Sequence, residues 1–227
     1  MTAVSEQRLA LASWCVPLAT MVLAMTVHAL SGPRAVPFFI SEADDGGLAG
    51  TIFTVGLFVA GALNAGYAYH LFRRIHPQQP RVWMAAFGAG LLSSVNLMLL
   101  SFLDMYNHID PHVVTSMLAF GGGITWVGLA WKAVGTAGHE RGQRWRRNGT
   151  LMSAAGFASM VGSFQWAANN VNAEGMTTTA FLNEVQHAIV VAAPGEYLLV
   201  AGLFVGLASF RFDLAKTSMA PATEEGP

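Results

Sequence analysis

The chain is dominated by long apolar runs that are separated by short polar stretches. Runs of roughly 20 mainly apolar residues, about 30 Å of helix at 1.5 Å per residue, lie near residues 10–30, 49–72, 82–103, 111–134, 149–171 and 186–210. These runs lack the alternation of polar and apolar positions that marks barrel strands. Lipid-facing backbone must be hydrogen-bonded within its own helix or in a closed barrel. The pattern therefore predicts an all-α fold, a polytopic integral membrane bundle of six transmembrane helices.

Composition agrees with this fold class. The 227 residues are 53% hydrophobic and only 11% charged, whereas a soluble domain is about 25% charged. The connections between the runs are too short to hold a soluble domain. We expect one transmembrane domain over residues 1–212 and a disordered cytoplasmic tail over residues 213–227, which is polar and rich in small residues. The first run is longer than the apolar core of a signal peptide, so we expect an uncleaved first helix.

The basic residues predict the orientation in the membrane. Every Lys and Arg except Arg34 lies before the first run, between the second and third, between the end of the fourth and the start of the fifth, or after the sixth. By the positive-inside rule both termini are expected to be cytoplasmic. The formal net charge of −1 gives no indication of a nucleic-acid partner. The single cysteine, Cys15, excludes an intrachain disulfide.

The loops predicted on the opposite, non-cytoplasmic face are acidic and rich in histidine. Asp110 and Pro111 are typical of a helix start, and His112 follows in the first turn, where the helix dipole favours a neutral imidazole that can accept a proton or bind a metal. The candidates for a polar pocket on this face are Ser41, Glu42, Asp104, His112, His187 and Glu196. The histidines that could contribute to a metal site are His28, His108, His112 and His187. Their spacing matches no established metal motif.

Glu196 is the most informative of these residues. It lies nine residues after His187 in the sixth run, roughly 13 Å along a helix. Insertion of a charged residue at a helix centre costs roughly 2.5 to 3.5 kcal/mol, and intramembrane acids are candidates for function. Pro194 leaves the carbonyl of Val190 without its usual helical partner and favours a bend beside the acid. The sequence therefore predicts a cavity around Glu196.

Other polar and small residues within the runs favour packing roles. Ser116 and Gln165 belong to a group of polar residues that commonly join transmembrane helices by hydrogen bonds. Gly202 and Gly206 form a GxxxG pair in the sixth run, a spacing typical of close helix contacts. Such contacts also favour a helix-mediated oligomer.

Three motifs together resemble the Frag1/DRAM/Sfk1 family of six-helix membrane proteins. The first outer loop reads Pro37, Phe39, Ile40, Ser41 and Glu42, with Phe38 as an additional residue, and matches the motif of that family. A histidine near the start of the fourth helix is matched by His112. A glutamate before an aromatic residue in the sixth helix is matched by Glu196 and Tyr197, although the preceding Pro-Gly departs from the family pattern.

The resemblance implies a role connected with membrane lipids, because members of the family are linked to remodelling of glycosylphosphatidylinositol anchors, to phosphoinositides and lipid asymmetry, and to autophagy. The first interpretation is a non-enzymatic protein that handles or senses lipid through a polar pocket on the non-cytoplasmic face, with membrane lipid as partner and no cofactor. One alternative is an intramembrane lipid hydrolase or acyltransferase that uses a divalent metal such as zinc, with His28, Asp104, His112 or His187 as ligand or base. Another is a proton-coupled transporter that uses Glu196 as relay.

The expected location is the cytoplasmic membrane in a prokaryote, or an endomembrane or the plasma membrane in a eukaryote.

Overall fold

Seven α-helices and two short 3-10 helices make up the part of the chain that the computed structural model describes, residues 3–219. The elements follow the order α1 (Ala3–Leu30), η1 (Ile40–Asp44), α2 (Gly47–Arg74), α3 (Pro80–Leu100), α4 (Ile109–Val134), η2 (Gly135–Ala137), α5 (Glu140–Ala168), α6 (Thr178–Glu184) and α7 (Gln186–Met219). No strand is present within these residues. The prediction of an all-helical fold is confirmed.

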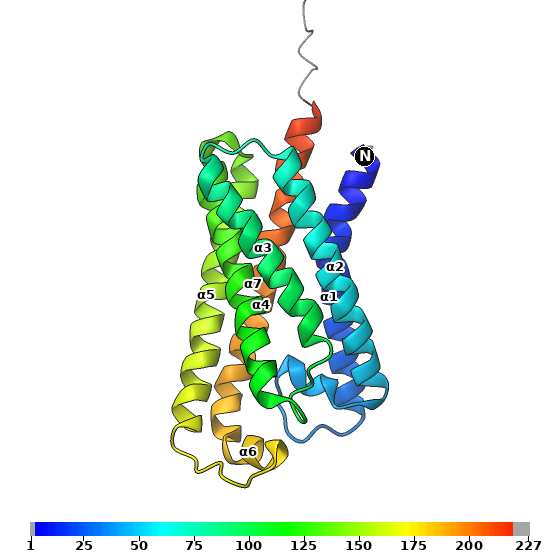
Figure 1. Cartoon of the computed structure of the whole chain (residues 1–227), viewed down its shortest axis with the longest axis vertical. Coiled ribbons are helices and arrows are strands. Elements are labelled where there is room, and N and C mark those ends of the chain that lie inside the picture. Colours follow the sequence, from blue (N-terminus) through cyan, green and yellow to red (C-terminus); the bar gives the residue numbers. More distant parts are fainter. Residues whose placement is uncertain (1–2, 220–227) are drawn as a thin grey trace, which may run out of the picture.

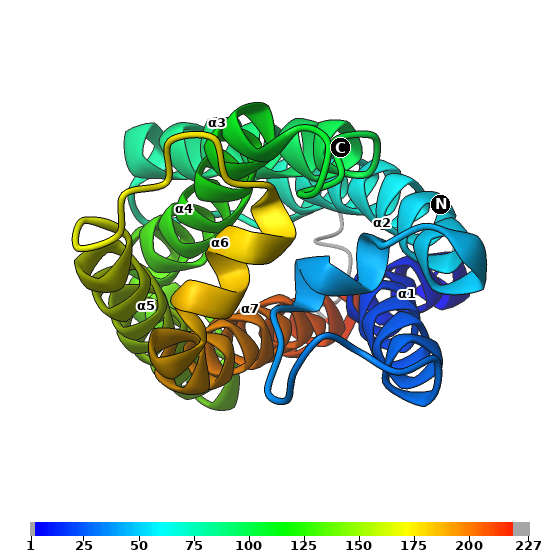
Figure 2. The same cartoon turned by 90° about the horizontal axis from the view of Figure 1, so that it is seen from below.

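The six long helices form a ring in which neighbours in the chain are neighbours in space. The pairs that form the ring are α1 with α2, α2 with α3, α3 with α4, α4 with α5, α5 with α7, and α7 with α1, and α7 also contacts α4 and α2. The start of α1 and the end of α7 lie at the same end of the bundle (Figure 1). At the opposite end, η1 and α6 lie across the ring (Figure 2). We call this opposite end the loop end.

Five of the helices are long and apolar enough to cross a membrane. These candidate spans are Ser5–Leu30, Gly47–Arg74, Pro80–Leu100, Ile109–Ala137 and Gln186–Ala215. The remaining predicted span, 149–171, falls within α5, which does not meet the same criterion of hydropathy and charge. Its first turns carry Arg141, Arg144, Arg146 and Arg147. Gly, Ser and Gln residues lower the mean hydropathy of the rest of the helix.

Two helices, α4 and α5, begin earlier in the chain than predicted, because polar residues before the apolar run are also helical. α5 begins at Glu140 instead of 149, because His139 accepts a hydrogen bond from Arg141 N (3.1 Å) and provides an N-cap. α4 begins at Ile109, so Asp110 lies in its first turn and is not the N-cap. Pro194 lies inside α7 without ending it.

A buried ion pair extends α7 beyond the predicted domain boundary. Arg146 of α5 is fully buried and forms a short ion pair with Asp213, whose other oxygen accepts a hydrogen bond from His139 N (2.7 Å). The start of α5 is thereby tied to the end of α7. Of the tail predicted over residues 213–227, residues 213–219 continue α7, and residues 220–227 lie outside the described residues.

α5 and α7 pack closely enough for their backbones to touch. A Cβ atom added at Gly156 would lie 2.4 Å from Leu199 N, and one added at Gly202 would lie 2.7 Å from the Gly149 carbonyl oxygen. A residue larger than glycine would force the helices apart at both positions. The predicted packing role of Gly202, together with that of Gly206, which approaches α4 as well, is confirmed.

Two substitutions on α5 test this contact. Gly156→Ala should destabilise the protein by about 1–3 kcal/mol, because the new methyl group clashes with backbone that cannot give way. Gly162→Ala is the matched control, since its added Cβ meets no atom within 4 Å, and it should be neutral or stabilise the helix by about 0.5–1 kcal/mol. Thermal unfolding in detergent measures both changes. Equal melting temperatures for the two variants would contradict the close packing.

Candidate functional site

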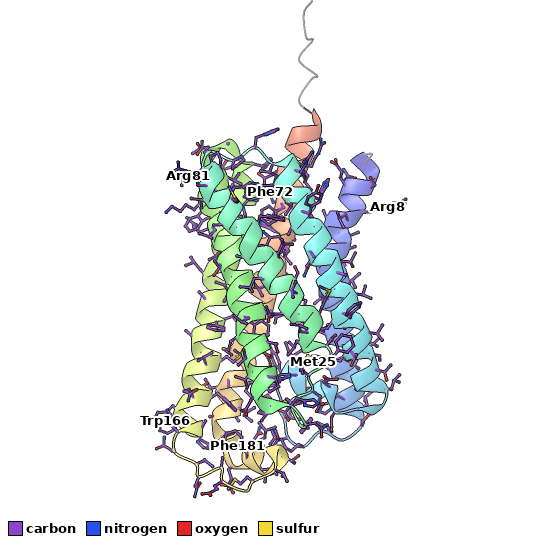
Figure 3. The ribbon with its side chains drawn as sticks, in the orientation of Figure 1. Arg8, Met25, Phe72, Arg81, Trp166 and Phe181 are labelled. Atoms are coloured by element: carbon purple, nitrogen blue, oxygen red, sulfur yellow. The ribbon has the colours of Figure 1, made fainter. Side chains whose placement is uncertain are left out.

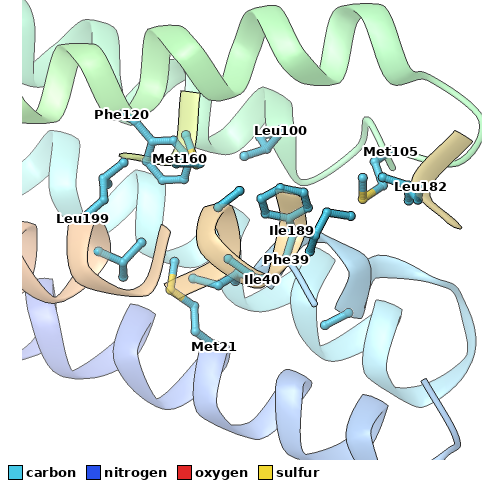
Figure 4. Close-up of a cluster of buried hydrophobic side chains, with 14 of the residues drawn as sticks. Met21, Phe39, Ile40, Leu100, Met105, Phe120, Met160, Leu182, Ile189 and Leu199 are labelled. Carbon is cyan, nitrogen blue, oxygen red and sulfur yellow. The ribbon is translucent and has the colours of Figure 1, made fainter. Parts of the chain in front are cut away.

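The first loop folds back into the loop end of the ring instead of lying on its surface. Phe38, Phe39 and Ile40 are buried, as are Glu42 and Asp44 of η1. Phe39 and Ile40 lie among core side chains that include Ile189 and Leu199 of α7 (Figure 4). The predicted family motif is thus part of the hydrophobic core. We call residues 37–44 the inserted segment.

Three side chains of α7 bind the backbone of the inserted segment. Glu196 Oε2 accepts a hydrogen bond from Ile40 N (2.7 Å). The Tyr197 hydroxyl donates a short hydrogen bond to the carbonyl oxygen of Phe38, and Gln186 Nε2 donates to that of Pro37 (3.1 Å). A segment this short satisfies few backbone groups internally, so α7 supplies the partners that buried N–H and C=O groups require.

Glu42 is fully buried but is engaged by other groups. Its carboxylate accepts hydrogen bonds from Arg34 (3.1–3.3 Å) and from Phe39 N (2.9 Å). Arg34 also donates to Asn183 Oδ1 of α6 (3.0 Å). Arg34 therefore neutralises Glu42 and connects the inserted segment to α6. Glu42, predicted as a pocket residue, has an evident structural role.

A cavity of about 230 Å³ lies beside the inserted segment, between α4, α5 and α7. It is lined by Phe39, Ser41, Met105, Ile109, His112, Val113, Ser116, Met117, Phe120, Met160, Val161, Phe164, Gln165 and Glu196. Three of the predicted pocket residues, Ser41, His112 and Glu196, thus line one cavity. Two residues of this lining, Val113 of α4 and Gln165 of α5, are exposed on the molecular surface.

His112 is held in one orientation within this wall. Its Nδ1 lies 2.5 Å from the carbonyl oxygen of Leu103. A carbonyl oxygen can only accept, so Nδ1 carries the proton, and Nε2 is the nitrogen that can accept a hydrogen bond in the neutral ring. The imidazole is buried, with 4% of the residue exposed. The arrangement suits recognition of a hydroxyl or amide donor.

Asp104 lies in a different hollow. A cavity of about 600 Å³ at the loop end is lined by three acids, Asp44, Asp45 and Asp104, together with the start of α2. Burial, and then the nearby charge of Asp104, raise the pKa of Asp44 to about 7. Burial alone would raise the pKa of Asp104, but hydrogen bonds from Asn107 and Tyr106 hold it below its ordinary value. Asp104 thus caps its own loop.

The four histidines predicted as metal ligands lie in separate surroundings. His28 is buried against the Phe38 ring, with 4.8 Å between ring centroids. His187 is exposed beside Trp166, and His108 is an exposed residue immediately before α4. Within residues 3–219 no three His, Cys, Asp or Glu side chains come together as a metal site would require. The structure therefore does not assemble the predicted ligand set.

Several residues of the site were not predicted as such. The sequence predicts packing roles for Gln165 and Ser116, whereas both side chains line the cavity. Gln186, Tyr197 and Arg34 were given no site role. A usable signal for Gln186 and Tyr197 was present, because each is a hydrogen-bonding residue on the same helix as Glu196 and close to it in sequence.

The contact between Glu196 and Ile40 can be tested by amide exchange. Glu196→Leu removes the acceptor and leaves a buried N–H group unpaired, which costs about 1–3 kcal/mol. The Ile40 amide, followed by mass spectrometry of peptides that cover residues 37–44, should then exchange roughly tenfold faster or more. Glu196→Gln is the control, because its amide oxygen can still accept the bond. Equal exchange in both variants would show that Glu196 does not hold the segment.

The comparisons with known proteins agree with the motifs. The family described as Frag1/DRAM/Sfk1/Cwh43P N-terminal domain matches residues 7–217. No curated protein and no solved structure matches the chain. The match covers nearly all of the long helices, the inserted segment and every residue that lines the cavity around Glu196. The chain therefore belongs to the Frag1/DRAM/Sfk1 family, as a membrane protein with at least five helices able to span the bilayer.

Proposed function

We propose that this protein binds a membrane lipid in the cavity beside Glu196, and that it handles or senses lipid in this way without catalysis. The observation that carries the proposal is the form of the cavity. Its wall is largely apolar, and polar groups from Ser41, His112 and Glu196 line it as well. Val113 of α4 and Gln165 of α5 are exposed residues of this wall. A lipid needs both an apolar wall and polar partners.

The size of the cavity supports partial insertion of a lipid. Ligand pockets usually measure about 300–1,000 Å³, and this one measures about 230 Å³. It can hold the polar part of a lipid and the beginning of a chain, while the remaining chain extends between α4 and α5 into the bilayer. Val113, an exposed apolar residue of the wall, would contact that chain.

The proposed orientation places the loop end, and therefore the cavity, on the non-cytoplasmic side. α5 would be a sixth span, antiparallel to α7, and both termini would be cytoplasmic. The positions of basic residues support this side, because Arg8 and Arg81 lie at the end where α1 begins (Figure 3). Trp166 lies at the loop end, as expected where α5 reaches a membrane interface (Figure 3). Basic residues favour the cytoplasmic side and Trp favours the interface.

Labelling of introduced cysteines tests this orientation. In a Cys15→Ser background, Ala137→Cys and Ala173→Cys place one thiol at each end of α5, both at exposed positions. If α5 crosses the membrane, an impermeant maleimide added to intact cells should label Ala173→Cys, whereas Ala137→Cys should react only after lysis. Labelling of both from the same side would exclude α5 as a span.

Blocking the cavity tests lipid binding. Met117→Trp should fill the space beside Phe120 and reduce retained lipid by tenfold or more, which corresponds to about 1.4 kcal/mol. Leu118→Trp is the matched control, since Leu118 is exposed and does not line the cavity. Native mass spectrometry of protein equilibrated with a total lipid extract of the expression membrane measures retained lipid.

Equal lipid retention by the two variants would overturn the proposal, provided that both melt at the temperature of the unmodified protein. Release of fatty acid from the added lipids would instead support the enzymatic alternative.

A further inference from the structure

The polar atoms of the cavity are uncharged groups and one acid. Among the described residues that line it, the hydrogen-bonding side chains are Ser41, His112, Ser116, Gln165 and Glu196, and none is Lys or Arg. Hydroxyl and amide groups can both donate and accept, whereas a carboxylate accepts only. The cavity is therefore rich in acceptors and lacks a cation.

The basic residue that binds the inserted segment is already engaged. Arg34 forms hydrogen bonds with both carboxylate oxygens of Glu42 and with Asn183, and its side chain is 9% exposed. Moving Arg34 into the cavity would leave Glu42 buried without its counter-charge, a change that usually costs several kcal/mol. Arg34 is therefore not available to a ligand in the cavity.

Glu196 keeps capacity to bind a donor. One carboxylate oxygen, Oε2, accepts the Ile40 N–H group, and a carboxylate has about four lone-pair sites. His112 offers Nε2 as a further acceptor, because its Nδ1 is used by Leu103. A ligand hydroxyl could donate to either group and accept from Ser116 or Gln165.

From this arrangement we infer that the cavity takes an uncharged, hydroxyl-bearing lipid and discriminates against anionic phospholipids. The inference rests on the proposed lipid binding and names its ligand class. A phosphate in the cavity would lie beside a buried acid with no cation to pair with it, and unpaired buried charge is strongly unfavourable. A glycerol hydroxyl meets partners for both its donor and its lone pairs.

Two lipids that differ only in the phosphate provide the test. Full-length protein in nanodiscs of phosphatidylcholine is titrated with dioleoylglycerol or with dioleoylphosphatidic acid, and binding is followed by native mass spectrometry. Dioleoylglycerol should bind at least tenfold more tightly. Equal or tighter binding of dioleoylphosphatidic acid would overturn the inference and leave the proposed lipid binding intact. Binding of neither lipid would overturn both.

A variant with an added cation should change the preference. Gln165→Arg places a guanidinium group in the cavity wall at an exposed position, so it should strengthen dioleoylphosphatidic acid binding about tenfold and change dioleoylglycerol binding little. Asn169→Arg is the control. It adds the same charge one turn away, outside the cavity, and removes the same hydrogen bond between Gln165 and Asn169.

An equal gain of phosphatidic acid binding in the two variants would show that general attraction to the anionic lipid, and not the cavity, determines the preference.

Discussion

The hydrogen bond from the Ile40 N–H group to Glu196 is the contact on which the loop end depends. Non-helical backbone is tolerated inside a membrane protein only where other groups satisfy it. The inserted segment meets this requirement through α7, where Gln186, Glu196 and Tyr197 bind its backbone groups. Without these partners the segment could not remain buried, and the cavity would lose the wall that Phe39 and Ser41 form.

The same acid connects folding with recognition. An apolar residue at position 196 would pack in the bundle but would leave Ile40 N unpaired, whereas a carboxylate satisfies that group and keeps acceptor capacity beside His112. Glu42 shows the opposite solution. Its carboxylate is paired with Arg34 and accepts a hydrogen bond from Phe39 N, so its charge is neutralised within the fold. Glu42 and Glu196 thus differ in role because only Glu42 is paired with a cation. Glu196 keeps acceptor capacity for a ligand.

Much of the fold could be predicted from the sequence because unpaired backbone groups and charged side chains are costly inside a membrane. Apolar runs of this length have few alternatives to membrane-spanning helices, and an acid within one of them is conspicuous. Ser41 and His112 were placed at the same end as Glu196 because loops alternate between the two ends of a bundle. They line one cavity with it because the first loop folds inward.

The direction of individual side chains and the rotation of each helix could not be predicted, because they depend on how the helices pack. Sequence gives the end of the bundle at which His187 and Asp104 lie, but not the direction in which each side chain projects, and neither lines the cavity around Glu196. Gln165 lines that cavity because backbone contact with α7 sets the rotation of α5. The seven-residue helix α6 has no long apolar pattern and depends on a cap from Thr177.

The glycine contact between α5 and α7 also has a mechanical consequence. Helices whose backbones touch cannot slide or roll against each other without steric overlap, so α5 and α7 form one rigid strut that extends to Arg146 and Asp213 at the far end. The inserted segment is bonded to this strut through α7. α4 shares a less extensive contact with α5. A separation of α4 from this strut would therefore move His112 away from Glu196, because the two residues line the same cavity from α4 and α7.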